Sequence, residues 1–171
     1  MIPKYYVKEF NNGNDIYVFL ESAKLHDYKL TKDGWQTNWI SDFIQDPYLD
    51  KYALKTISTN ELIGLAAYRF MEKERTIVIE YMEASPASNP TINHDKRKYS
   101  GIGKVLIAFA VQLAIDHGFD GLIILKAKTT ELRKHYIKNY NAFSFRRDDM
   151  FTLMIAPDDS YKLFRDYLVE E

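Results

Sequence analysis

The sequence predicts a mixed α/β fold, with one domain over residues 1–171. Three β-rich runs follow one another in the first half, and a glycine turn then leads into an apolar helix and a short apolar strand. Of the 171 residues 46% are hydrophobic, and 13 Tyr and 10 Phe supply aromatic area for a core. No repeat, low-complexity tract or linker divides the sequence, so we expect a single core.

The β-rich runs are Tyr52–Ile57, Leu62–Phe70 and Thr76–Met82, and short polar stretches separate them. Such short separations favour hairpins, so we expect an antiparallel meander. The segment before these runs has no clear pattern at its start, and we expect it to be irregular there.

Three aromatic residues upstream of the meander, Trp35, Trp39 and Phe43, have the spacing of one helix face. Asp46-Pro47 would then end the helix, since proline cannot continue it. We therefore expect one amphipathic helix over this stretch.

The pattern changes from Glu83 to Tyr99, where prolines, asparagines and basic residues show no apolar periodicity, and we expect a loop. A helix with one apolar stripe follows the glycine turn and ends at Gly118. Gly121–Leu125 is a short continuous apolar run, typical of a strand covered on both faces. This strand should lie parallel to the last strand of the meander, with a right-handed crossover through the helix.

The last third of the sequence predicts a helix followed by a hairpin. Thr129 or Thr130 can cap a helix that runs to about Asn139. Phe143–Phe145 and Phe151–Ile155 flank a polar turn and are expected to pair.

Charge and composition exclude several function classes. The formal net charge is −1, so no overall field attracts nucleic acid or an anionic membrane, and we expect neither partner. A single-stranded nucleic-acid binder is disfavoured for the same reason. Local positive charge gathers in one patch, formed by Lys96, Arg97, Lys98 and Lys104.

Cysteine is absent, which agrees with a reducing compartment and excludes disulfides and thiolate metal sites. The first residues lack the apolar core of a signal peptide and no run has the length of a membrane span, so we expect a cytoplasmic protein. The histidines lack the spacing of a ligand set, and we expect no metal. They are His26, His94, His117 at a helix C-terminus, and His135 in either the core or a cleft wall.

The glycine turn, Ser100-Gly101-Ile102-Gly103, stands where the loop becomes the helix. Glycines there let the backbone approach a ligand, and the free amides of a helix start favour a phosphate. The alternative is that the glycines only shape a tight helix entrance. The segment has neither the spacing of a P-loop nor the preceding strand of a dinucleotide fingerprint.

These residues resemble a family. Lys98 to Gly103 is similar to the Q/R-x-x-G-x-G/A motif of the GNAT superfamily of N-acetyltransferases, with Lys98 in the Gln/Arg place. The order of strand, loop, helix, strand and tyrosine segment over residues 77–145 is also similar. The resemblance implies a three-layer αβα fold whose mixed sheet has an antiparallel N-terminal meander and a splayed parallel pair of strands.

The resemblance also implies binding of acetyl-CoA as co-substrate. Its diphosphate would lie on the turn, and its pantetheine arm would pair like an extra strand with the end of the fourth strand. The implied contacts are Lys98, Tyr99, Ser100, Gly101, Ile102, Gly103 and Lys104 at the turn, and Met82, Glu83 and Ala84 at the strand. The acetyl group would pass directly to a primary amine in a ternary complex.

Acetyl transfer needs a donor to the departing thiolate and a means of removing a proton from the amine. Tyr136 occupies the place of the family's general-acid tyrosine, although it can equally be a helix residue that packs on the sheet. Tyr140 is the rival, four residues later.

Glu80 and Glu83 are the candidate bases, acting directly or through water. A regular strand would send them to opposite faces, so that only one can face the cleft unless a bulge intervenes. We prefer Glu80, because it interrupts an otherwise apolar run; a carboxylate on the solvent face is the alternative.

The residues leave the acceptor open among small amines, antibiotics, polyamines and protein amines. The loop Pro86 to Arg97 is where we expect acceptor contacts or a partner surface. A CoA-binding module without turnover is the alternative function, and the family resemblance makes a homodimer possible.

Overall fold

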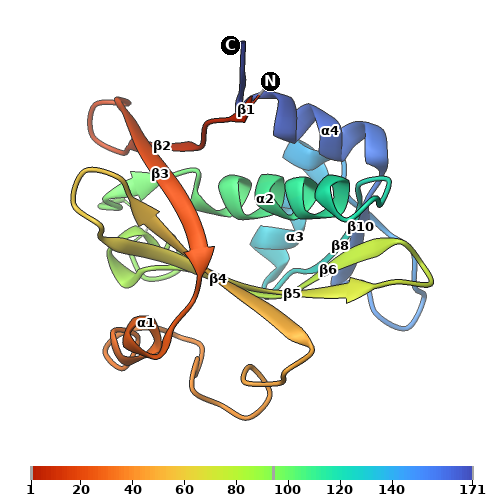
Figure 1. Ribbon diagram of the computed structural model, residues 1–171, viewed down its shortest axis with the longest axis horizontal. Coiled ribbons are helices and arrows are strands. Elements are labelled where there is room, and N and C mark those ends of the chain that lie inside the picture. Colours follow the sequence, from red (N-terminus) through yellow and green to blue (C-terminus); the bar gives the residue numbers. More distant parts are fainter. Residues whose placement is uncertain (1, 94, 171) are drawn as a thin grey trace.

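The computed structural model describes residues 2–93 and 95–170. Segments rich in β-branched and aromatic residues form a nine-stranded sheet in the order β7-β2-β3-β4-β5-β6-β8-β10-β9 (Figure 1). Its strands are β2 Tyr6–Glu9, β3 Asp15–Ser22, β4 Leu49–Thr56, β5 Leu62–Met71, β6 Thr76–Ala84, β7 Tyr99–Ser100, β8 Leu122–Lys126, β9 Phe143–Ser144 and β10 Thr152–Ile155. A separate antiparallel pair, β1 Ile2–Pro3 and β11 Leu168–Val169, joins the two ends of the described chain.

The predicted meander is confirmed, because β4, β5 and β6 pair antiparallel in sequence order. The irregular opening that we expected is wrong. β2 and β3 pair with each other there, and β3 pairs with β4. Only Val18 of β3 is buried, so the strand lacks the alternation that would have revealed it.

The helices are α1 Leu25–Lys29, α2 Ile102–Asp116, α3 Thr130–Tyr140 and α4 Pro157–Arg165, with a short 3₁₀ turn at Pro86–Ser88. α2 and α4 pack together over one face of the sheet, and α1 lies beyond the other (Figure 1). None of the described helices has the length and apolar character that a membrane crossing needs.

The expected helix over Trp35, Trp39 and Phe43 is wrong. Turns occupy this stretch, and the helix α1 lies before it. Trp39 is 1% exposed whereas Phe43 is 81% exposed, so the two rings do not share a buried face. Tertiary contacts outweigh the local spacing, because backbone amides at Gln36 and Thr37 donate to the distant Glu83 instead of entering a helix.

The predicted apolar helix is confirmed as α2. Gly101 precedes it with φ +90°, a left-handed conformation that glycine adopts without strain, and Gly118 follows its end with φ +77°. Its buried side chains lie in the main hydrophobic cluster with residues of β5, β6 and β8. His117 is the C-terminal cap residue, as expected, and its ring Nε2 hydrogen-bonds to Glu72 at 2.6 Å.

β6 and β8 form the predicted parallel pair, and the pair is splayed. Thr76–Ile79 of β6 align with Leu122–Leu125 of β8, and β6 then continues to Ala84 without β8 beside it. The antiparallel meander and this parallel pair give the mixed sheet that we predicted.

A bulge in β6 decides where its two glutamates point. The register with β5 shifts between Ala67 and Tyr68, which leaves Glu80 as the extra residue. Ile79 and Met82, three positions apart, therefore both pack in the main cluster. The bulge that we allowed for is present, and Glu80 and Glu83 lie on the same face, away from α2.

The predicted C-terminal helix and hairpin are confirmed as α3, β9 and β10, and the Thr129 hydroxyl caps α3 by accepting from the Leu132 amide at 3.1 Å. α4 and β11 were not predicted.

Candidate functional site

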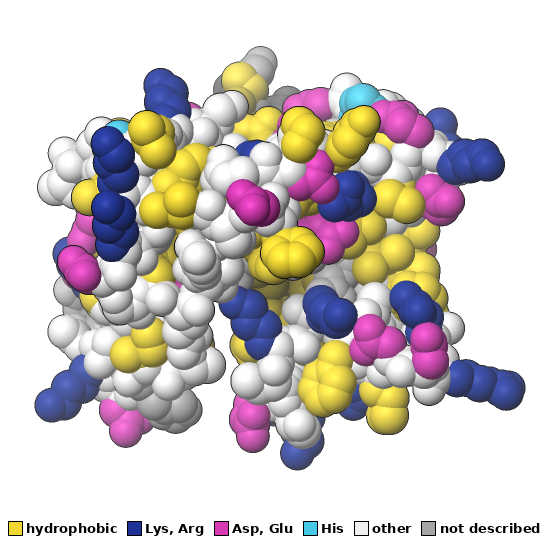
Figure 2. All heavy atoms as spheres, turned by 90° about the horizontal axis from the view of Figure 1, so that it is seen from below, with side chains coloured by type: hydrophobic (Ala, Val, Ile, Leu, Met, Phe, Trp, Pro, Cys, Tyr) yellow, Lys and Arg dark blue, Asp and Glu magenta, His cyan; other side chains and the backbone are white. Residues whose placement is uncertain are grey.

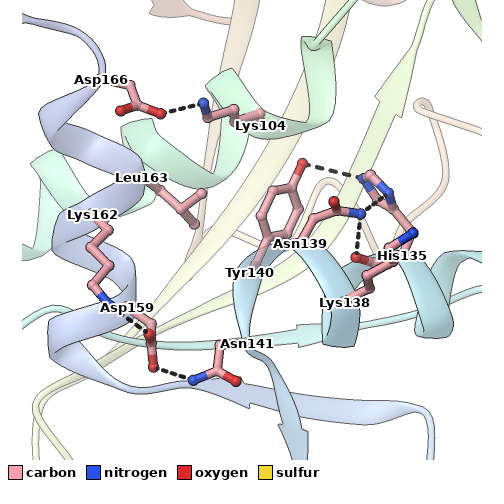
Figure 3. A pocket seen from close by; sticks show the side chains of 10 residues that line it. All are labelled: Lys104, His135, Lys138, Asn139, Tyr140, Asn141, Asp159, Lys162, Leu163 and Asp166. Carbon is pink, nitrogen blue, oxygen red and sulfur yellow. Dashed lines mark hydrogen bonds and ion pairs between the residues drawn. The ribbon is translucent and has the colours of Figure 1, made fainter.

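Two cavities are candidates for a ligand site. The first measures about 710 Å³ and lies between α2, α3 and α4, with Lys104, His135 and Tyr140 among its lining residues (Figure 3). The second measures about 480 Å³ and lies at the splayed strand ends, with Glu80, Lys128 and Tyr136 among its lining residues. The face seen in Figure 2 is hollowed by a notch, and acidic and basic side chains are mixed across it.

The start of α2 is open. Among the described residues, no side chain caps this end of the helix, and no acceptor is found for the amides of Ile102, Gly103 and Lys104. A Cβ atom added at Gly101 or Gly103 would meet nothing within 4 Å. The helix entrance is therefore accessible, and its amides and dipole favour an anion.

The residues just before the entrance are engaged within the protein. The Tyr99 amide donates to the Ser88 hydroxyl at 3.0 Å, and Tyr99 and Ser100 pair with β2. Lys98 forms an ion pair with Glu61 at 2.6 Å between Nζ and Oε1, and the Tyr99 hydroxyl donates to the same carboxylate. The structure thus directs Lys98 to Glu61.

Lys104, in contrast, lies in the first turn of α2 and lines the first cavity, where its ammonium pairs with Asp166 of the segment after α4 (Figure 3). Of the four residues in the predicted basic patch, Lys104 is the one that lines this cavity. The Arg97 guanidinium lies over the ring of Phe10, 4.7 Å from its centroid.

His135 and Tyr140 point toward each other in the first cavity, with 3.3 Å between Nε2 and the hydroxyl oxygen (Figure 3). Burial, with a further contribution from the charge of Arg97, lowers the pKa of His135. Burial raises the pKa of Tyr140 to about 12. Of the two expectations for His135, the cleft wall is the correct one. Sequence reasoning did not single out the neighbouring polar residues Lys138, Asn139 and Lys162.

Tyr136 lies on the second cavity and is 6% exposed. Its hydroxyl has no hydrogen-bond partner among the residues that the structure describes. Burial raises its pKa well above the ordinary value, and the neighbouring Tyr140 contributes to the same shift. The rings of Tyr136 and Tyr140 stack with their centroids 5.9 Å apart. Tyr136 lines the second cavity and Tyr140 lines the first.

Glu80 lines the second cavity and forms an ion pair with Arg69, at 3.1 Å between Oε1 and Nε. Arg69 also pairs with Asp46 at 3.3 Å. The bulge therefore places Glu80 at the edge of the splayed region, beside Tyr136 in the lining of one cavity.

Glu83 is a buried anchor. It is 5% exposed, and its carboxylate accepts from the Gln36 amide at 2.6 Å, the Thr37 amide at 3.1 Å and the Trp39 indole at 2.9 Å. We call residues 36–39 the anchored segment. The carboxylate is engaged by these donors and lines neither cavity. The indole of Trp39, which needs an acceptor when buried, is the sequence signal that could have suggested such a partner.

The loop Pro86 to Arg97 packs against the anchored segment, since Asn89 and Thr91 both donate to the Gln36 side chain, at 3.3 Å and 3.1 Å. His94, which we placed in this loop, lies outside the described residues. In the described ranges no group of three or more His, Cys, Asp or Glu gathers as a metal site would require.

Comparison with known proteins identifies the fold. No family model matches the sequence, and no curated protein matches it significantly. Among solved structures, AtaTR bound with AcCoA is similar at 14% identity and TM-score 0.60, covering 86% of this chain and 98% of that one. An acetyltransferase of the GNAT family from Listeria monocytogenes is similar at 14% identity and TM-score 0.54, covering 88% and 98%.

A chimera of the spermidine N-acetyltransferase SpeG from Vibrio cholerae and hSSAT is similar at 12% identity and TM-score 0.55, covering 84% of this chain and 98% of that one. The chain therefore has the fold of the GNAT acetyltransferases.

Proposed function

We propose that this protein transfers the acetyl group of acetyl-CoA to a primary amine, in a ternary complex of the two substrates. The GNAT fold supports this function, and the open N-terminus of α2 beside the splayed strands is the observation that carries it. Free amides at a helix start and the helix dipole together favour a phosphate group, and CoA brings a diphosphate.

The diphosphate binds the amides of Ile102, Gly103 and Lys104 in this proposal. Tyr99 and Ser100 contribute the shape of the turn, because the Tyr99 amide already has a partner and both residues pair with β2. The nucleotide end of CoA lies in the first cavity, where Lys138 adds positive charge and Lys104 pairs with Asp166. Lys98 takes no part, since Glu61 neutralises it.

The pantetheine arm lies along Met82 to Ala84, where β6 has lost β8 as a neighbour and offers the backbone edge of a strand. Glu83 contributes only its backbone, because its side chain holds the anchored segment. This path leads the thioester into the second cavity, beside Tyr136.

The chemistry needs one bond formed and one broken. The neutral amine attacks the thioester carbonyl, so that a C–N bond forms and the C–S bond breaks. The Tyr136 hydroxyl donates its proton to the leaving sulfur, and its raised pKa keeps it protonated. Glu80 receives the proton that the amine loses, directly or through water.

A thiol-release assay with acetyl-CoA and a panel of primary amines tests this function. We expect release of CoA that depends on the amine, with formation of the N-acetyl product by mass spectrometry. Binding of acetyl-CoA without turnover on any amine would instead favour a CoA-binding module. The absence of binding would overturn both.

A further inference from the structure

Among the described residues that line the second cavity, one positive charge has no counterion. Four charged side chains line it: Glu80, Lys126, Lys128 and Asp149. Glu80 pairs with Arg69, and Lys126 lies 3.7 Å from Asp149. Lys128 has no ion-pair partner among the residues that the structure describes, and its ammonium donates to the Thr37 hydroxyl at 3.1 Å.

Lys128 stands at the mouth of the splayed region. It follows the end of β8 by two positions, and its contact with Thr37 reaches the anchored segment that Glu83 holds at the end of β6. The ammonium is therefore positioned between the two strands that separate. A neutral hydroxyl is a weaker partner than a carboxylate or phosphate, so an anion entering here can replace it.

The acidic groups of the cavity are not available to a second ammonium. The Asp149 carboxylate accepts from the Phe151 amide and from the amide and hydroxyl of Thr152, and these hydrogen bonds and Lys126 lower its pKa. Glu80 is held by Arg69 and is assigned to the proton of the amine. The rest of the wall is largely apolar, with Met82, Leu132 and Phe151.

We propose that the acceptor is a small amine that carries an anionic group, a carboxylate or a phosphate, and that Lys128 binds this group. The apolar wall accommodates a hydrophobic part of the acceptor, between its amine and its anionic group. This inference rests on the proposed acetyl transfer and specifies its acceptor class. It disfavours polyamines, whose further ammonium groups would meet Lys128 and find no free carboxylate in the lining.

Matched acceptors test the proposal. Phenylalanine and phenethylamine differ by the carboxylate, and phosphoethanolamine and ethanolamine differ by the phosphate, so the two pairs also distinguish the anion. At saturating acetyl-CoA we expect kcat/KM to favour the anionic member of at least one pair by about tenfold to a hundredfold, as for a charge-assisted hydrogen bond.

The Lys128→Met variant should remove this preference through the KM of the anionic acceptor, and Lys128→Glu should reverse it. Lys126→Met is the matched control and should keep the preference, because Lys126 is already paired with Asp149. Acetyl-CoA binding by calorimetry, measured for every variant, should not change.

The proposal is overturned if wild type turns over uncharged or cationic amines as well as anionic ones, in which case acetyl transfer itself still stands. It is also overturned if Lys128→Met changes the KM of acetyl-CoA and not that of the acceptor. A protein that binds no acetyl-CoA would refute the proposed function first and this inference with it.

Discussion

The indole Nε1 of Trp39 donates a 2.9 Å hydrogen bond to Oε1 of Glu83, and both side chains are buried. The same carboxylate accepts from two backbone amides of the anchored segment. One glutamate at the end of β6 therefore fixes a stretch of turns that has no regular secondary structure to hold it. That stretch is linked to the second cavity through Thr37, whose hydroxyl accepts from the ammonium of Lys128.

Glu83→Gln should destabilise the protein. The amide of glutamine has one acceptor oxygen and two donors, so it cannot serve three N–H groups, and a buried donor is left unpaired. We expect the free energy of unfolding to fall by about 1–3 kcal/mol in urea titrations. Glu80→Gln is the matched control on the same strand face. It should change stability by about 1 kcal/mol or less, since its partner Arg69 is partly exposed. Equal stability of Glu83→Gln and wild type would refute the anchoring role.

Tyr136→Phe should lower kcat by about a hundredfold, the usual contribution of a general acid, and should leave acetyl-CoA binding intact. Stability should change little, because the hydroxyl has no hydrogen-bond partner among the described residues. Tyr140→Phe is the control: it removes a hydroxyl that faces the other cavity and bonds to His135. Turnover by Tyr136→Phe equal to that of wild type would exclude this tyrosine as the acid.

The pH profile carries a second signature of Tyr136. Burial raises its pKa above the ordinary value of 10, so the donor form persists at higher pH than for a free phenol. The wild-type rate should therefore show no loss from ionisation of the phenol as the pH approaches 10. A limb of the kcat profile that falls below pH 10 in wild type and is missing in Tyr136→Phe would contradict the raised pKa.

His135 should make stability depend on pH near neutrality. Its pKa in the folded protein is lowered from 6.5, so the unfolded chain binds the proton more readily. Stability from this group is present above pH 6.5 and is lost as the pH falls through the folded-state pKa. We expect the melting temperature of wild type to fall in this window by more than that of His135→Gln. Parallel curves for the two proteins would show that His135 is not responsible.

The sequence predicted those parts of the fold that depend on local pattern. Apolar alternation and spacing revealed the meander, α2 and β8, and Thr129 marked the start of α3. The helix predicted from the spacing of Trp35, Trp39 and Phe43 was wrong. The conformation of this stretch depends on Glu83, which is 44 positions from Trp39. α4 was missed although Pro157 stands in its first turn, a position that proline favours.

The sequence predicted only the part of the site that the family motif covers. The resemblance pointed to the glycine turn and to Tyr136, but it could not show that Lys98 pairs with Glu61, 37 positions away. A regular strand would place Glu80 and Glu83 on opposite faces. The bulge in β6 places them on the same face, and the sequence did not reveal this bulge. No sequence pattern singled out Lys128. Its proposed role depends on having no ion-pair partner among the described residues, which only the structure could show.

The most direct measurement of the central claim is a calorimetric titration of acetyl-CoA into wild type and Gly103→Glu. Gly103 lies in the first turn of α2 without a positive φ, and open space surrounds the position that a Cβ atom would take there. The glutamate therefore adds negative charge at the helix entrance without a clash. Ile115→Glu, at the exposed far end of α2, is the control.

We predict binding of acetyl-CoA by wild type and by the control, and binding weakened by about tenfold or more in Gly103→Glu at an unchanged melting temperature. Equal affinity of Gly103→Glu and wild type would contradict the account, as would the absence of binding by wild type.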